Sequence, residues 1–171
     1  MKLEIDFFVE RRLGDPQVKI IVDDYISLYT GDAQENFQFD VDLPNGGHDL
    51  KIVHYDKKPN HHVHDPYGNI VVDRHIEIKR IALDEVDLER ELWDGKFFPV
   101  YMHKSDSEPY FICPNLYLGH NGTWKFEFVA PVLPWLIATR QQGPKLDNTI
   151  FQTNAGILEE AKNFFKDLPD V

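Results

Sequence analysis

The chain has 171 residues and a formal net charge of −11 at pH 7, with 42% hydrophobic and 13% aromatic residues. A chain of this length buries roughly 70% of the surface that it exposes when unfolded, which is enough for one proper core. Clustered Lys and Arg side chains drive binding to a phosphate backbone or to an anionic membrane surface, so the acidic charge argues against nucleic acid and membranes as partners.

The N-terminal residues and the cysteine content indicate the cellular compartment. The single cysteine, Cys113, can form no internal disulfide and no cysteine-based metal site. The first residues alternate apolar and polar side chains without an apolar centre, so we expect no signal peptide. No apolar run approaches the roughly 20 residues that span a bilayer. We therefore expect synthesis in a cytoplasm and no membrane insertion.

The first half of the chain alternates apolar and polar side chains with the period of two of a half-buried strand. Gly, Pro, Asn and Asp residues separate the runs. These runs predict strands near residues 3–9, 18–22, 25–29, 37–43, 50–55 and 70–83. In the last run the inward-facing parity changes between Ile78 and Ile81, which predicts a β-bulge near Lys79 or Arg80.

The second half is less regular. Prolines interrupt the strands predicted at 96–102 and 109–118, and proline in a sheet belongs at edges or bulges. Asn121-Gly122 predicts a tight hairpin turn, and the alternating run that starts at Trp124 predicts a core strand. Apolar side chains at residues 153–168 have helical spacing and predict an amphipathic helix.

Together these elements predict a mainly β protein, an antiparallel, jelly-roll-like β-sandwich with one C-terminal amphipathic helix. The sequence has no repeat and no linker, so we expect residues 1–171 to form a single domain. Residues 1–88 would hold the regular strands, 89–152 the proline-interrupted strands, and 153–168 the helix. A brief helical rhythm between Asp87 and Asp94 marks the candidate boundary.

The connection from Lys57 to Asp73 holds the densest group of potential ligands. Calcium takes six to eight oxygen ligands, and Asp65, Asn69 and Asp73 would supply several of them. The sequence therefore predicts these three residues as calcium ligands. The alternative is an ordinary Asp-Pro-Tyr-Gly-Asn turn in which Asp65 caps its own backbone.

His62-Val-His64 places two imidazoles on one strand face, as in the metal sites of cupins. A cupin-like metalloenzyme is therefore the enzymatic alternative. Against it, Tyr67 and Gly68 stand where cupins have a glutamate, and a solvated loop also explains the histidines.

Sugar binding without a metal needs an exposed aromatic ring beside polar groups. Tyr67, Trp93 and Tyr110 stand in loop-like contexts and are the candidates, although Trp93 would equally plug one end of the sandwich. No pair of carboxylates can be singled out for hydrolysis, and the sequence has no phosphate-binding glycine loop or hydrolase motif. This absence favours recognition over catalysis.

The segment from Val18 to Ile81, and above all its strand Val-Val-Asp73-Arg74-His75-Ile-Glu-Ile, resembles the calcium-dependent xylan-binding type of carbohydrate-binding module. An Asp-Arg-Asn strand recurs in that family, and His75 stands where the family has Asn. The resemblance covers the first half of the chain. It implies a jelly-roll sandwich in which calcium contacts sugar hydroxyls, and it carries over only Asp73 and Arg74.

The second half, from Ile78 to Pro131, resembles small proteins of large tailed bacteriophages in overall texture. This implies a virion- or tail-associated protein whose partners are a glycan or neighbouring virion proteins, with a homo-oligomer as one form. We therefore expect a non-enzymatic recognition or structural module; a purely structural assembly subunit is a further alternative. The expected ligand-binding residues are His62, His64, Tyr67, Arg74 and Trp93.

Overall fold

The computed structural model describes residues 1–100 and 115–141. The chain divides into two compact units, residues 1–135 and residues 136–171. Both sheets belong to the first unit. The helix predicted at 153–168 lies outside the described residues, as do Tyr110 and Cys113.

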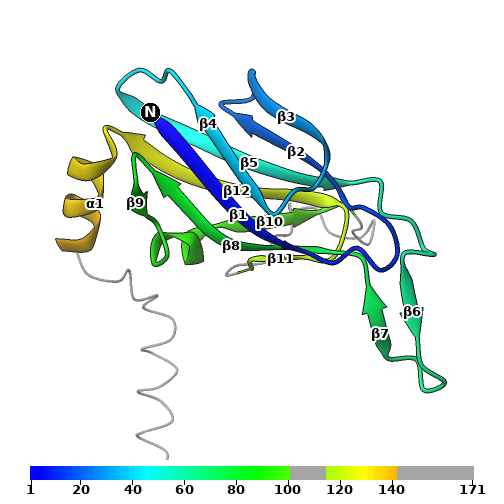
Figure 1. Cartoon of the computed structure of the whole chain (residues 1–171). Coiled ribbons are helices and arrows are strands. Elements are labelled where there is room, and N and C mark those ends of the chain that lie inside the picture. The colour runs from blue at the N-terminus through cyan, green and yellow to red at the C-terminus, as the bar shows by residue number, and fades with distance from the viewer. Residues whose placement is uncertain (101–114, 142–171) are drawn as a thin grey trace, which may run out of the picture. The chain divides into compact units, whose positions relative to one another are not determined.

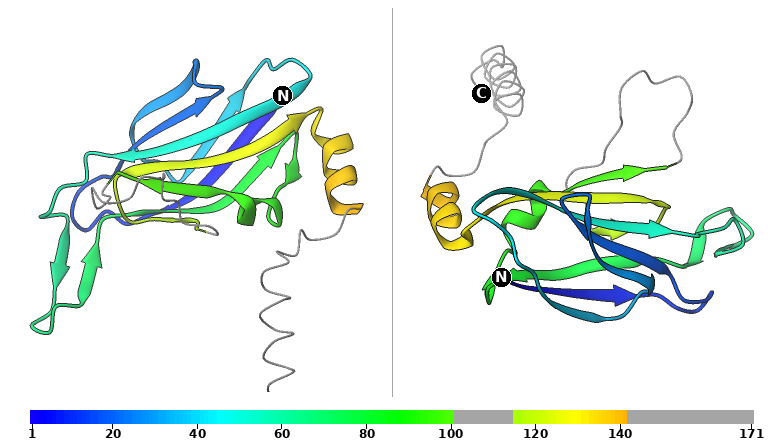
Figure 2. Two further views of the ribbon diagram at one scale, coloured as in Figure 1. Left: turned by 180° about the vertical axis from the view of Figure 1, so that it is seen from behind. Right: turned by 90° about the horizontal axis from the view of Figure 1, so that it is seen from above.

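The first unit contains two five-stranded antiparallel sheets, which Figures 1 and 2 show as two stacked layers. One sheet has the strand order β11 (Tyr117–Leu118), β8 (Ile76–Leu83), β1 (Lys2–Val9), β4 (Asn36–Asp40). The short strand β9 (Val86–Asp87) pairs with β8 outside this order. The other has the order β10 (Lys96–Pro99), β12 (Gly122–Ala130), β5 (Gly46–Tyr55), β2 (Gln17–Val22), β3 (Ile26–Asp32). The chain passes repeatedly between the sheets, as in jelly-roll-like sandwiches.

The core lies between the two sheets and holds the apolar residues whose alternation predicted strands. Side chains from both sheets are at most 1% exposed, among them Leu3, Ile5, Val18, Ile20, Leu50, Ile52, Ile76, Ile78 and Trp124. Across the layers, the ring of Tyr29 on β3 lies 4.7 Å from that of Phe37 on β4. The predicted mainly β antiparallel sandwich is confirmed, and so is the burial of Trp124.

In the described part of the chain, α1 (Val132–Gln141) follows β12. The sequence pattern did not predict this helix. Pro134 is compatible with it because the first N–H groups of a helix have no intrahelical acceptor. Neither α1 nor the short 3-10 turn in the described ranges has the length and apolar character that crossing a bilayer requires.

The predicted bulge on β8 is confirmed. Asp6 of β1 pairs with Arg80 and the next residue, Phe7, pairs with Ile78, so Lys79 is the extra residue. The side chains on both sides of the bulge, including Ile78 and Ile81, therefore face the core.

The strand predicted at 70–83 is two strands. Its first part, β7 (Ile70–Asp73), pairs with β6 (His62–His64) in a two-stranded ribbon that projects from one end of the sandwich (Figure 1). The break falls at Arg74, whose buried guanidinium donates to the backbone carbonyls of Asp15 and Asp56. A charged side chain that needs these acceptors ends the regular alternation.

The hairpin predicted at Asn121-Gly122 is wrong, because β11 and β12 lie in different sheets. The Asn121 side chain instead pairs with the backbone of Lys57: its Oδ1 accepts from Lys57 N at 2.7 Å and its Nδ2 donates to Lys57 O at 2.8 Å. Gly122 is required by packing, since a Cβ there would lie 2.5 Å from the carbonyl oxygen of Phe98.

This packing predicts that Gly122→Ala destabilises the fold by about 1–3 kcal/mol through overpacking. Gly47→Ala is the matched control, because Gly47 also lies in a sheet strand but has nothing within 4 Å of an added Cβ. Urea denaturation of both variants measures the difference. Equal free energies of unfolding for the two variants would contradict the packing role of Gly122.

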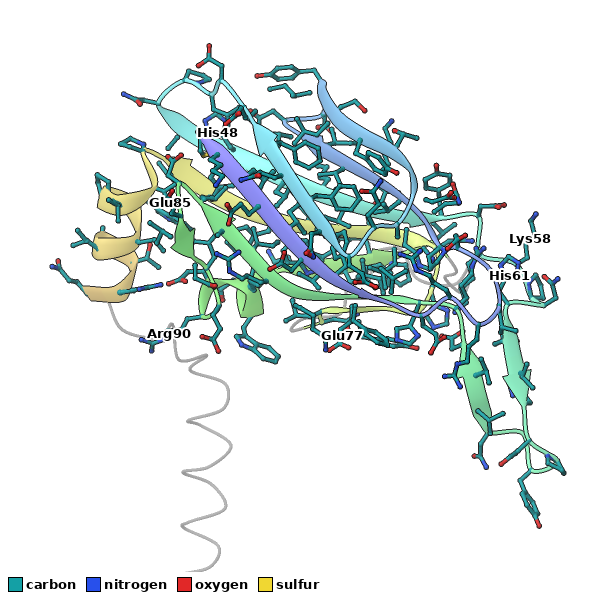
Figure 3. The ribbon with its side chains drawn as sticks, in the orientation of Figure 1. His48, Lys58, His61, Glu77, Glu85 and Arg90 are labelled. Atoms are coloured by element: carbon teal, nitrogen blue, oxygen red, sulfur yellow. The ribbon has the colours of Figure 1, made fainter. Side chains whose placement is uncertain are left out.

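A buried histidine lies at the end of the sandwich opposite the ribbon (Figure 3). His48 Nδ1 is 2.6 Å from the Asp23 carboxylate and Nε2 is 2.8 Å from the carbonyl oxygen of Pro44. Burial opposes the charged form, but the hydrogen bonds to Asp23 and Pro44 outweigh it and raise the pKa of His48. Burial likewise disfavours charge on Asp23, yet the Asp49 N–H and His48 lower the pKa of Asp23.

The raised pKa of His48 makes stability depend on pH. Because the folded pKa lies above the unfolded one, the stabilisation is fully present below about pH 6.5 and is lost as the pH rises through the folded pKa. Asp23 sets the acid limit, because its contribution is lost as the pH falls through its lowered pKa. We expect His48→Gln to cost on the order of 1 kcal/mol at pH 6 and less at pH 9, by urea denaturation. A cost that is equal at both pH values would refute the ion pair.

Candidate functional site

A cleft of about 690 Å³ lies at the base of the ribbon. The cleft is lined by residues of the ribbon, of the connections that meet there and of the edge of one sheet. They are Arg12, Lys57, Lys58, Pro59, His62, His64, Ile70, Val71, Asp73, His75, Tyr117, Gly119, His120 and Asn121. Figure 3 shows Lys58 at this corner, where β5 leads into the ribbon. Segments far apart in the sequence therefore build one site.

An ion pair holds the base of the cleft. The Lys57 ammonium donates to the Asp73 carboxylate and to the carbonyl oxygen of Gly119, and the Tyr117 hydroxyl donates to Asp73 at 2.8 Å. The side chains of Lys57 and Asp73 are only 9% and 12% exposed. Burial and the negative charge of Asp73 raise the pKa of Tyr117, so its hydroxyl stays protonated and donates. This network ties the ribbon to the β11–β12 connection.

Two rings in tilted contact form one wall. The rings of Tyr117 and His75 lie 4.5 Å apart, and Phe8 lies 5.7 Å from His75. Gly119 leaves room for the tyrosine, because a Cβ there would lie 2.3 Å from the Tyr117 ring. Tyr117 remains 43% exposed, so this ring pair presents an aromatic surface to the cleft.

His62 and His64 lie on the ribbon with ring centroids 4.8 Å apart, and both line the cleft. His64 Nδ1 lies 2.9 Å from the carbonyl oxygen of Gly68, to which it donates. Within residues 1–100 and 115–141, no group of three or more His, Cys, Asp or Glu side chains is arranged to hold a metal. The described residues thus bring together the two imidazoles of the cupin-like hypothesis without a third ligand.

The candidate calcium ligands lie at opposite ends of the ribbon. At the tip, Asp65 Oδ1 accepts from the N–H groups of Tyr67 and Asn69 at 2.9 and 2.8 Å, and Oδ2 accepts from the Asn69 side chain at 2.9 Å. Hydrogen bonds from Asn69 accordingly lower the pKa of Asp65. Asp73 pairs with His62 across the ribbon. Because His62 precedes Asp65 by three residues, Asp73 lies about 10 Å from Asp65 along the ribbon. As placed, the three residues do not fit one calcium ion.

The other predicted ligand-binding residues do not line the cleft. Tyr67 is 90% exposed at the ribbon tip, and Trp93 lies on the short 3-10 turn η1 (Glu91–Asp94). Arg74 is buried, with its backbone N–H donating to the carbonyl oxygen of His61 at 2.9 Å. Of the eight predicted site residues, the cleft brings together His62, His64 and Asp73.

Sequence reasoning missed much of the cleft, namely Arg12, Lys57, Lys58, His75, Tyr117 and His120. Of these residues, only Tyr117 could have been recognised as exposed from the local sequence. Its neighbour Leu118 faces the core, and strand alternation therefore turns the Tyr117 ring outward. Comparison of the chain with known protein families, with curated proteins and with solved structures found no match.

The ion pair at the base of the cleft predicts a stability effect. Asp73→Asn removes the carboxylate that balances the nearly buried Lys57 ammonium, and we expect a loss of about 1–3 kcal/mol. Glu127→Gln is the control, because it breaks a surface pair with Lys125 in which Glu127 is 71% exposed, worth at most about 1 kcal/mol. Chemical denaturation of both variants compares them, and a smaller loss for Asp73→Asn would contradict the network.

Proposed function

We propose that the chain is a non-enzymatic recognition module that binds a glycan in the cleft at the base of the ribbon. The exposed ring of Tyr117, which lies against His75 and beside polar side chains, carries this proposal. A sugar ring presents an apolar face that stacks on an aromatic ring, while its hydroxyls require hydrogen-bonding partners around the edge. The cleft offers both kinds of contact.

The hydrogen-bonding groups near the Tyr117 ring support the proposal. Among the described residues, the side chains of His62 and His120 make no hydrogen bonds, so their ring nitrogens remain for a ligand. The volume of about 690 Å³ is within the range of roughly 300–1,000 Å³ typical of small-molecule sites. The Asp73 carboxylate, held by Lys57, fixes the Tyr117 ring before a ligand binds, which lowers the entropic cost of binding.

The proposal requires no calcium. Asp65 and Asn69 satisfy each other in the turn at the ribbon tip, and Asp73 neutralises Lys57. Calcium-dependent binding remains the expectation from the resemblance to the xylan-binding modules, and a chelator separates the two possibilities.

We further propose a place in a virion or tail, where a glycan-binding sandwich would serve adhesion to a host surface. This part rests on the resemblance of residues 78–131 to small proteins of tailed bacteriophages. Neighbouring virion proteins are the second class of partner. Detecting the chain by mass spectrometry in purified particles supports this placement, and its absence from them refutes it.

A glycan array tests the proposed site. We expect wild-type chain to bind with and without chelator, Tyr117→Ala to lose about ten-fold or more in affinity, and Tyr117→Phe to keep most of it because the ring remains. Tyr67→Ala is the matched control, an exposed tyrosine outside the cleft. Loss of binding in Tyr67→Ala, with binding kept in Tyr117→Ala, would move the site to the ribbon tip.

A further inference from the structure

The charge of the cleft is opposite to the charge of the chain. Among the described residues that line it, Arg12, Lys57 and Lys58 face a single carboxylate, that of Asp73, whereas the whole chain has a formal charge of −11. The Asp73 carboxylate accepts from Lys57 and from the Tyr117 hydroxyl, so its charge is compensated inside the site. A concentration of cations on an acidic protein favours an anionic ligand at that place.

Two of the cations keep donor capacity for a ligand. Glu10 binds Nε and Nη2 of Arg12 at 3.0 and 2.7 Å, and Nη1 has no hydrogen-bond partner among the described residues. The Lys58 ammonium lies 3.6 Å from Asp56, beyond hydrogen-bond distance, and its side chain is 62% exposed. The exposed Lys58–Asp56 pair contributes little energy, so a ligand can recruit Lys58 at small cost. Arg12 can offer Nη1 to a ligand while it keeps its bonds to Glu10.

Arg74 is a buried cation between the cleft residues Asp73 and His75 in sequence. The Arg74 guanidinium is hydrogen-bonded to two backbone carbonyls and, among the described residues, forms no ion pair with a carboxylate. Its effect on neighbours is visible in His54, whose pKa falls to about 4 because of burial and then because of the positive charges of Lys57 and Arg74. Burial and the charges of Arg74 and Lys58 likewise lower the pKa of His61. Lys57, Lys58 and Arg74 therefore lie close together at this corner of the molecule.

We propose that the cleft selects acidic glycans, with the carboxylate or sulfate group of the sugar bound by Arg12 and Lys58 while the sugar ring stacks on Tyr117. This inference deepens the proposed function and rests on it. Guanidinium and ammonium groups bind both kinds of acid through charge-assisted hydrogen bonds. Neutral sugars would use only the ring and the polar groups, and would bind more weakly.

Calorimetric titration with matched ligands tests the proposal. The probes are an oligogalacturonate, its fully methyl-esterified form, which has the same rings without the charge, and a sulfated oligosaccharide with its desulfated counterpart. We expect wild-type chain to bind at least one acidic probe about ten-fold more tightly than its neutral partner, with an affinity that falls as salt rises. Preference for the carboxylate or for the sulfate probe identifies the source of the acid.

Variants locate the acid-binding groups. We expect Arg12→Gln and Lys58→Gln each to weaken acidic probes about ten-fold and to leave neutral probes unchanged. Arg11→Gln and Lys79→Gln are the controls, because both side chains are exposed, ion-paired and outside the cleft. Equal loss in the controls would show a general charge effect and overturn the proposed contacts.

The outcomes separate this inference from the proposed function. Binding of neutral probes as tight as that of acidic probes, lost in Tyr117→Ala, overturns the acid selectivity and leaves glycan recognition in place. Failure of wild-type chain to bind any of the four probes or any glycan on the array overturns both.

Discussion

The ion pair between Lys57 and Asp73 is the contact on which the cleft depends. It joins the end of β7 to the segment after β5 and, through the carbonyl oxygen of Gly119, to the β11–β12 connection. The same carboxylate accepts from the Tyr117 hydroxyl and so fixes the exposed ring. Because both charges are nearly buried, either one alone would be costly, and the three segments are held together as a unit.

The fold was predictable because its signals are local. Alternation of apolar residues defined most strands of the two sheets, and the parity change after Ile78 predicted a bulge near Lys79 or Arg80, which the structure has at Lys79. The predictions that were wrong concern places where a residue distant in sequence determines the local structure. Arg74 ends a strand because its guanidinium needs the carbonyls of Asp15 and Asp56, and Asn121 pairs with the Lys57 backbone in place of forming a hairpin turn.

The site was less predictable because it is assembled from segments that no spacing connects. The histidine-rich connection gave His62 and His64, both of which line the cleft, but Arg12 and Tyr117 come from opposite ends of the sandwich-forming unit in sequence. Asp73 was predicted as a metal ligand, and the structure pairs it with an ammonium group instead. Only the folded chain shows which charges neutralise one another and which remain for a ligand.

Residue-resolved NMR mapping tests the location of the glycan site most directly. When labelled chain is titrated with an acidic oligosaccharide, we expect the largest chemical-shift changes at Lys58, Tyr117, His120 and Asn121, with His48 at the far end of the sandwich unaffected. Changes confined to the ribbon tip around Tyr67, or the absence of changes at the cleft while binding is saturated, would contradict it.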